Sequence, residues 1–423
     1  MNVRWPDRQT VKKISGVLGV LGVLGVLVGL GVGEAHAVNQ EIRALFQPDP
    51  AQPGKNLFVN QTPNGGYCAT FPERCAATNM FSIELPVRHD SIRPILPGDD
   101  LSVKVPADWR RLTVTNTETQ QSEIVEVRIT GLGSEFYLSN TVEELTGVAQ
   151  PTGHDILWTS QTGWLYAPAP CGGSGLANYT SRSYRFFWHT PVQASCTKTA
   201  AFRIPSMYFN KLDFAYELRT PNPLGMSSGL YTGSITYSIG PTGDFQLGAM
   251  MEPDDGNLTL DFVLDVQHTL KVDIPPGGNH VVLEPSGGWQ HWLDSGRKPE
   301  RLYRDQTFLL SSSSKFSMKL ECGIVVEGGC AIASSESGSR YGGRVDVSVS
   351  LPNGLTDSVG QPVKRFKLGR EPSAPFHPGI YVDRKPGTLH FEVGPQATNW
   401  FLINAQHSPF AGNITMIWDS EVD

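Results

Sequence analysis

Two pairs of adjacent carboxylates are the residues of this sequence that could take part most directly in a hydrolytic reaction. They are Asp99 with Asp100 and Asp254 with Asp255. A hydrolase of glycosidic bonds needs two carboxyl groups, one as general acid and one as base or nucleophile. Both pairs stand next to Gly, Pro or Asn, where an Asp side chain commonly bonds to its own backbone. We therefore interpret both pairs as turn residues.

The histidines and glycines form no motif of a metal site or of a phosphate-binding loop. No H-x-H or H-E-x-x-H spacing occurs, and no glycine-rich loop is followed by Lys and Ser or Thr. The sequence therefore indicates no metal, no cofactor and no catalytic residue.

Six cysteines lie along the chain as three neighbouring pairs: Cys68 with Cys75, Cys171 with Cys196, and Cys322 with Cys330. An even number of cysteines in an exported chain is typical of disulfides. None of the spacings is C-x-x-C, so a zinc or thioredoxin site has little support. We predict that nearest neighbours pair, although six cysteines allow other connectivities.

The first 37 residues have the pattern of a secretory signal peptide. Four basic residues precede an uncharged apolar run at 14–32, and Ala35 and Ala37 form an A-x-A cleavage site. An uncleaved membrane anchor is the alternative. Export is therefore expected.

The whole chain has 423 residues and a formal net charge of −7. The segment after the signal peptide is long enough for two or three domains. An acidic chain without a basic run argues against nucleic acid and anionic membranes as partners.

Alternation of apolar and polar residues predicts β-strands through most of the chain. The longest run, 258–274, is interrupted at His268, where we expect a bend or a bulge and a histidine that belongs to the core. Further strands are expected at 81–87, 316–322, 345–351, 389–393 and 414–418, and a hairpin at 112–129. Residues 288–295 are a helical candidate, too short to carry weight.

One strand pattern occurs twice, at residues 231–239 and 410–418. In both, an aromatic residue stands two positions before the glycine of a Gly-x-Ile-Thr sequence, and every second residue is apolar or Gly. Chance similarity of two strands is one interpretation. The other is that each copy closes one β-domain. The sequence then predicts an all-β protein of two tandem Ig-like or jelly-roll β-sandwiches, with domains at 38–241 and 242–423.

The C-terminal pattern, from Phe410 to Trp418, lies behind a signal peptide and two cysteine-stapled β-domains. In this respect the chain resembles fimbrial subunits of the chaperone–usher class, and its layout is similar to that of their two-domain tip adhesins. The resemblance implies an incomplete, pilin-type C-terminal sandwich. It implies as partners a periplasmic chaperone, an outer-membrane usher and an adjacent pilin subunit that adds a donor strand. The residues at the chaperone and donor-strand positions are Gly412, Ile414, Met416 and Trp418.

A shaft pilin also carries a donor strand at its mature N-terminus. Here residues 38–46 alternate only in part and Pro48 stops them, which favours a subunit at the tip of a fimbrium on the cell surface. The resemblance then implies a binding protein without enzymatic activity, whose N-terminal domain binds a surface receptor, expected to be a glycan. A minor subunit or assembly initiator without a receptor is one alternative, and a secreted β-rich carbohydrate-active enzyme is another.

Aromatic residues crowd into residues 150–200, interleaved with Gly, Ser, Thr and Asn. Most should pack in a β-core, and some should lie on loops. The receptor-binding candidates are Trp158, Trp164, Tyr166, Tyr179, Arg182 and Arg185.

Overall fold

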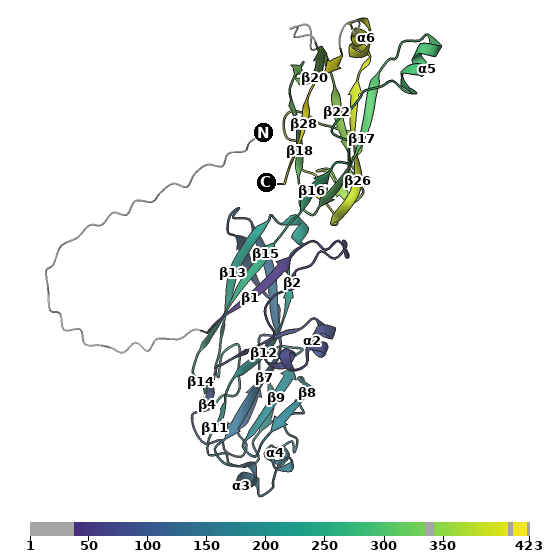
Figure 1. Ribbon diagram of the computed structural model, residues 1–423. Coiled ribbons are helices and arrows are strands. Elements are labelled where there is room, and N and C mark those ends of the chain that lie inside the picture. The colour runs from purple at the N-terminus through teal and green to yellow at the C-terminus, as the bar shows by residue number, and fades with distance from the viewer. Residues whose placement is uncertain (1–37, 335–341, 405–408, 421–423) are drawn as a thin grey trace, which may run out of the picture. The chain divides into compact units, whose positions relative to one another are not determined.

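A computed structural model describes residues 38–334, 342–404 and 409–420 of the protein. These residues form mostly β-strands, which build two domains with separate hydrophobic cores (Figure 1). The predicted all-β class with two β-sandwich domains is confirmed. The predicted signal peptide lies outside the described residues. No helix in the described ranges combines the length and the hydropathy needed to cross a membrane.

The N-terminal domain contains fifteen strands and five short helices. They are β1 (Val38–Phe46), β2 (Val59–Asn60), α1 (Gly66–Thr70), α2 (Pro72–Thr78), β3 (Phe81–Leu85), β4 (His89–Ser91), β5 (Asp100–Val103), β6 (Arg110–Asn116), β7 (Ser122–Leu138), α3 (Val142–Thr146), α4 (Thr152–Ile156), β8 (Gly172–Tyr179), β9 (Ser183–His189), β10 (Cys196–Thr199), β11 (Met207–Phe209), β12 (Leu212–Arg219), η1 (Pro223–Gly225), β13 (Gly229–Ser238), β14 (Met251–Pro253) and β15 (Asn257–Val266).

The C-terminal domain contains the remaining described elements. They are β16 (Leu270–Asp273), α5 (Gly288–Ser295), β17 (Leu302–Ser312), β18 (Ser317–Cys322), β19 (Val325–Val326), β20 (Gly329–Ser334), β21 (Gly342–Arg344), β22 (Asp346–Ser350), β23 (Leu355–Thr356), β24 (Phe366–Lys367), β25 (His377–Pro378), β26 (Val382–Val393), α6 (Pro395–Asn404), β27 (Phe410–Ala411) and β28 (Ile414–Asp419).

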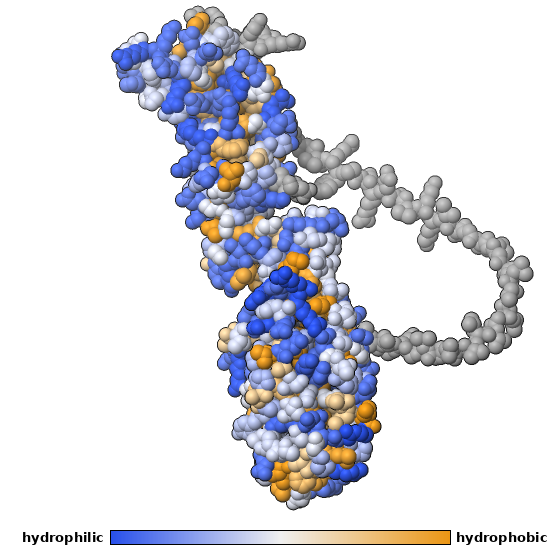
Figure 2. All heavy atoms as spheres, turned by 180° about the vertical axis from the view of Figure 1, so that it is seen from behind, coloured by the Kyte–Doolittle hydropathy of each residue, from blue (hydrophilic) through white to orange (hydrophobic). Residues whose placement is uncertain are grey.

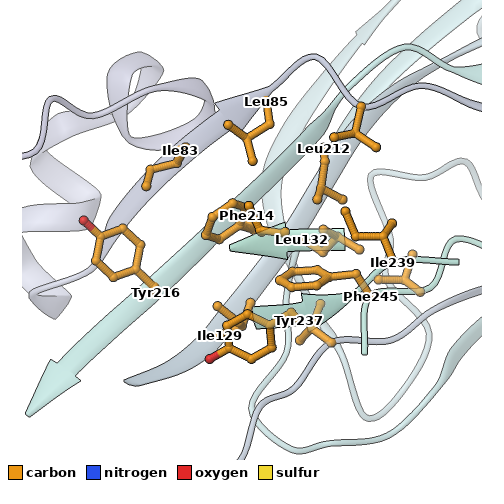
Figure 3. Close-up of a cluster of buried hydrophobic side chains, with 14 of the residues drawn as sticks. Ile83, Leu85, Ile129, Leu132, Leu212, Phe214, Tyr216, Tyr237, Ile239 and Phe245 are labelled. Atoms are coloured by element: carbon orange, nitrogen blue, oxygen red, sulfur yellow. The ribbon is translucent and has the colours of Figure 1, made fainter. Parts of the chain in front are cut away.

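Strand β7 organises the N-terminal domain. Its first half pairs with β6, its middle with β12, and its second half with β9 and β11. Val125, Val127 and Ile129 alternate along it and are buried. These pairings join thirteen strands into one branched sheet, whose buried side chains form one large core. Figure 3 shows side chains from β3, β7, β12 and β13 pointing toward one another in that core.

The N-terminal strand β1 is built into this same domain. It runs parallel to β15, with Val38 opposite Leu258 and Phe46 opposite Val266. Ile42, Ala44 and Phe46 point inward and are buried, as expected for alternate residues of a strand with one buried face. On its other edge β1 pairs with β2.

The predicted boundary between residues 241 and 242 falls inside the N-terminal sheet. Strand β15, which comes after that boundary, pairs with β13 over ten residues and contributes Leu258 through Val266 to the first core. The copy of the repeated pattern at 231–239 therefore does not close the domain, because β15 and β1 lie beyond it in the sheet. We propose instead that the N-terminal domain ends after Val266.

The long alternating run is interrupted around His268, between the end of β15 and the start of β16. The imidazole Nε2 lies 2.9 Å from the Met226 carbonyl oxygen, and the ring meets Phe46 edge-on at a centroid distance of 5.6 Å. Burial lowers the pKa of His268. The residue is thus a satisfied histidine packed against the core.

The C-terminal domain places a five-stranded sheet, in the order β16-β17-β26-β22-β24, against the pair β18–β28. The predicted strands at 316–322, 345–351, 389–393 and 414–418 are present as β18, β22, β26 and β28. The helical candidate at 288–295, too short to carry weight in the sequence, is helix α5. The second copy of the repeated pattern is divided into β27 and β28 by Gly412 and Asn413.

All three predicted disulfides are present: Cys68–Cys75, Cys171–Cys196 and Cys322–Cys330. The first joins α1 to α2. With Tyr67, Met80 and Phe187, this disulfide forms a small cluster of its own.

Candidate functional site

Strand β28, at the C-terminal end of the described chain, is the first candidate site. In the described part of the chain its ladder has one partner, β18, with Ser317 opposite Asp419 and Cys322 opposite Ile414. A strand paired on one edge leaves backbone N–H and C=O groups on its other edge for another strand. The predicted interface strand therefore has the geometry for strand addition.

The apolar face of β28 is only half-buried. Ile414, Met416 and Trp418 all pack against the C-terminal core, yet each keeps part of its side chain in solvent. The Trp418 ring lies 5.1 Å from that of Phe308 and 5.6 Å from that of Phe316. This domain thus carries apolar surface that its own chain does not fully cover.

A hollow of about 280 Å³ lies in the same domain. Its apolar lining residues include Leu320, Val347 and Leu368, and its charged ones include Arg344 and Asp346. Leu320 is the direct cross-strand partner of Met416. Directly opposed residues of paired strands share a face, so the hollow lies on the side of the sheet toward which Met416 points.

Gly412 has a role within the chain itself. A Cβ at this position would lie 2.6 Å from the Ala331 carbonyl oxygen, closer than side chains tolerate. The neighbouring β27 pairs there with β20, with Ala411 opposite Ala333. The glycine therefore permits the close approach of β27 to β20, and its predicted contact with a chaperone or donor strand stays a prediction.

Two of the six receptor candidates lie in the core. Trp158 and Trp164 are both 0% exposed. Their rings meet at a centroid distance of 5.4 Å, and Trp164 stacks on Trp188 at 4.7 Å. A ring without exposed surface cannot stack on a receptor, so these two residues are structural. The sequence could not separate them from their exposed neighbours, because residues 150–170 show no strand period.

The two tyrosine candidates are exposed and lie near one another. Tyr166 is 61% and Tyr179 42% exposed. Tyr179 stacks on Tyr184 at 5.7 Å, and the Leu165 amide donates to the Tyr184 hydroxyl at 3.1 Å. Tyr184 therefore holds both segments at one end of the β8–β9 hairpin.

The two arginine candidates have partners of their own. The Arg182 guanidinium donates to the Ser139 carbonyl oxygen and lies 3.9 Å from the Glu144 carboxylate. Arg185 Nη2 lies 3.2 Å from Glu84 Oε2 and 3.7 Å from Asp213 Oδ2. Arg182 stays half-exposed near Tyr179 in the chain, whereas Arg185 serves an ion-pair network.

Asp99, Asp254 and Asp255 each accept a hydrogen bond from a backbone amide, as turn residues commonly do, whereas Asp100 begins strand β5 and accepts from the Thr199 hydroxyl. Asp99 binds Arg93 and accepts from the Leu96 amide; these bonds lower the pKa of Asp99 to about 2. Asp254 accepts from the Arg88 amide and Asp255 from the Asn257 amide.

One motif was missed in the sequence. Residues 225–229 have G-x-S-x-G spacing, which in hydrolases places a nucleophilic serine at a strand-to-helix turn. Here Ser227 lies between η1 and strand β13 instead. Its amide is 3.0 Å from the Tyr231 hydroxyl, which serves the turn rather than a reaction. The strand–turn–helix setting of a nucleophile is therefore not met.

Surface hydropathy alone does not locate a site. On the face drawn in Figure 2, hydrophobic residues form separate patches among hydrophilic ones in both domains. No group of three or more His, Cys, Asp or Glu side chains is placed to hold a metal among the described residues. Strand pairing and cavities, rather than surface hydropathy, indicate where a partner or ligand could bind.

No family model and no curated protein matches the chain. Among solved structures, similar layouts occur in fimbrial tip adhesins. One is CfaE, the adhesive subunit of the CFA/I fimbria of enterotoxigenic Escherichia coli, at 8% identity over 92% of this chain and 94% of that chain, with a TM-score of 0.27. A chaperone–tip adhesin complex of CFA/I fimbriae gives 9% identity, coverages of 92% and 97%, and a TM-score of 0.24. The CsuC–CsuE chaperone–tip subunit complex of archaic Csu pili from Acinetobacter baumannii gives 8% identity over 90% of this chain and 98% of that chain, with a TM-score of 0.21. Likeness at this level carries no further conclusion.

Proposed function

We propose that this protein is a fimbrial tip adhesin without enzymatic activity. In this proposal the C-terminal domain is held in the fimbrium by a donor strand from the adjacent pilin subunit, and the N-terminal domain binds a glycan on another surface. Strand β28 supports the proposal most directly, because it combines a single ladder partner within the described chain with a half-buried apolar face. An added strand would supply both missing contacts at once.

The position of β1 supports a place at the tip. A subunit inside the shaft must give its N-terminal segment to a neighbour. Here residues 38–46 pair with β15 and β2 of their own domain and bury Ile42 and Phe46. Withdrawing this strand would expose that apolar surface and break the ladder. The chain is thus suited to accept a donor strand but not to supply one.

We also propose that a chaperone and an usher assemble the subunit into the fimbrium. A half-covered apolar face beside an open strand edge promotes aggregation when nothing covers it. A periplasmic chaperone would protect β28 after export, and an outer-membrane usher would pass the subunit to the cell surface. The exposed Tyr166, Tyr179 and Arg182 are the receptor contacts that we retain from the sequence.

The test adds a donor-strand peptide, taken from a shaft pilin of the same organism, to the chain from residue 38 onward. We expect the peptide to raise the melting temperature and to stay bound during gel filtration. Met416→Asp should abolish both effects, because it places a charge in the apolar face of β28.

A matched control makes the same change elsewhere. Ile124→Asp alters an apolar strand residue that is 49% exposed in the N-terminal domain. This variant should respond to the peptide as the unaltered chain does. If the peptide changes nothing at saturating concentration in a chain that is already stable, the C-terminal sandwich is complete and the proposal fails.

A further inference from the structure

Strand β24 ends the five-stranded sheet of the C-terminal domain, and positive charge gathers around it. Among the described residues its ladder has one partner, β22, with Lys367 opposite Ser348. The short segment 364–370 carries four basic side chains, although the whole chain has a formal net charge of −7. The outer edge of β24 is therefore a local basic surface in an acidic protein.

We propose that this edge docks an extended acidic segment of a partner protein, whose carboxylates bind at the mouth of the hollow described above. Arg344, Lys367 and Arg370, which we call the basic edge, belong to the lining of that hollow of about 280 Å³. The inference goes beyond the proposed function, because it requires neither the donor strand nor a receptor.

The hollow opens where the chain crosses from one sheet to the other. The Leu368 amide donates to the Val347 carbonyl oxygen in β22 at 2.9 Å, and the Gly369 carbonyl oxygen accepts from the Leu320 amide in β18 at 2.8 Å. Adjacent residues thus bond strands of two different sheets. These backbone bonds form the basic edge before a partner arrives, which reduces the entropy lost on binding.

Positive charge exceeds negative charge in the lining of the hollow. Asp346 Oδ1 lies 3.2 Å from Arg344 Nε and 3.1 Å from Lys367 Nζ, and Asp346 is the one carboxylate among the described lining residues. Arg370 forms no ion pair within the described chain. Three cations against one carboxylate leave a surplus of two positive charges. Complementary charges determine partner choice at protein interfaces, so this surplus favours an acidic partner.

The basic side chains are accessible to a partner, whereas the apolar residues of the hollow are not. The Lys367 side chain is 66% and the Arg344 side chain 35% exposed, and Arg370 is exposed as well. Leu320 and Leu368 are each only 4% exposed, so they join the two sheets rather than meet a ligand. Guanidinium groups bind carboxylates with two parallel hydrogen bonds, which adds geometric preference to the charge.

Basic residues on an edge strand also serve to discourage pairing with other strands. An edge with that role alone would reject strands of every charge. The surplus of positive charge predicts instead that the basic edge binds acidic segments and rejects neutral and basic ones. The two roles therefore differ in what an experiment would measure.

The experiment measures the binding of a fluorescently labelled peptide that alternates Asp and Val to the chain from residue 38 onward, by fluorescence anisotropy. Alternation places the carboxylates on one face of an extended peptide. Matched peptides carry Asn or Lys in place of Asp. We expect the acidic peptide to bind roughly tenfold more tightly than the Asn peptide, the Lys peptide not to bind, and added salt to weaken binding of the acidic peptide.

Two charge reversals locate the contact. Lys367→Glu and Arg370→Glu should each weaken binding of the acidic peptide roughly tenfold or more. Lys385→Glu is the matched control, because it changes the net charge equally at an exposed position of β26 in the same domain. This control should bind the acidic peptide as the unaltered chain does.

Equal binding of the acidic and Asn peptides overturns the inference, and so does unaltered binding of the acidic peptide by both Lys367→Glu and Arg370→Glu. Binding of phosphatidylglycerol vesicles in place of the peptide also overturns it, since the surface would then recognise lipid. The melting-temperature response to the donor-strand peptide is measured in the same variants, so failure at the basic edge is distinct from failure of the assembly proposal.

Discussion

The two copies of the Gly-x-Ile-Thr pattern form strands with different surroundings. Strand β13 lies between β6 and β15 and buries Tyr231 and Tyr237 completely. Strand β28 has β18 on one edge in the described chain, and its apolar side chains are half-buried. The alternation of apolar residues therefore specifies which face turns inward. It does not specify how many strands complete the sheet.

The glycine of the Gly-x-Ile-Thr pattern has the same packing role in both copies. A Cβ on Gly233 would lie 2.2 Å from the Thr113 carbonyl oxygen, and one on Gly412 would lie 2.6 Å from that of Ala331. Each glycine lets its strand approach the backbone of a neighbour. The shared pattern thus describes packing against a neighbour within the chain, while the open edge of β28 follows from the absence of a further strand in the described C-terminal domain.

The first prediction compares an aromatic residue from each strand. Tyr237→Ala should lower the free energy of unfolding of the N-terminal domain by about 3–5 kcal/mol, because the ring is fully buried and packs against Phe245. Trp418→Ala should cost the C-terminal domain only about 1–2 kcal/mol, since part of its ring is already in water. Urea denaturation followed by fluorescence measures both. Equal losses would mean that β28 is as well covered as β13.

Many of the strands and all three disulfides of the two domains could be predicted from the sequence. Period two located β15, β18, β22, β26 and β28, and the cysteine spacing predicted all three disulfides. The domain boundary could not be found, because one alternating run, 258–274, supplies strands to both domains. Alternation of apolar and polar residues indicates that one face of a strand is buried, but it does not indicate which domain's core that face joins.

The candidate sites were less predictable than the fold. Trp164 and Tyr166 stand two residues apart in an aperiodic segment, yet one is buried and the other is exposed. A pocket of about 370 Å³ in the N-terminal domain combines residues of β7, β9 and β12 with the segment after α2. It depends on a bulge at Thr130, for which no signal exists in the sequence.

The second prediction concerns the disulfides of the two domains. Cys171–Cys196 closes a longer loop than Cys322–Cys330, with separations of 25 and 8 residues. Replacing each pair by alanines should cost about 3.5 and about 2.5 kcal/mol, respectively, from loop-closure entropy alone. Calorimetry of the two double variants measures the difference. A larger loss for the shorter loop would contradict the loop-length argument and would show that the C-terminal domain depends on its disulfide more than the loop length implies.

The third prediction substitutes the two glycines. Gly233→Ala and Gly412→Ala should each destabilise by about 1–3 kcal/mol, because the new methyl group forces backbone to move. The loss should be larger for Gly233, since β13 is held from both sides and cannot shift. Thermal unfolding of both variants checks the order. The reverse order would show that residues 410–419 are more rigidly placed than their single ladder partner indicates.

The fourth prediction uses pH to separate the domains. Burial raises the pKa of Asp213, in the N-terminal domain, to about 7, although Arg185 and Lys211 oppose the shift. Between about pH 4 and pH 7 the carboxyl is protonated in the folded state and ionised in the unfolded chain. The folded state then binds more protons, so the stability of the N-terminal domain should fall as the pH rises through this window. One group can contribute at most about 1.4 kcal/mol per pH unit. Asp213→Asn is neutral at every pH and should flatten the slope in urea titrations of that domain. An unchanged slope would mean that Asp213 ionises normally in the fold, with its charge balanced by Arg185 and Lys211.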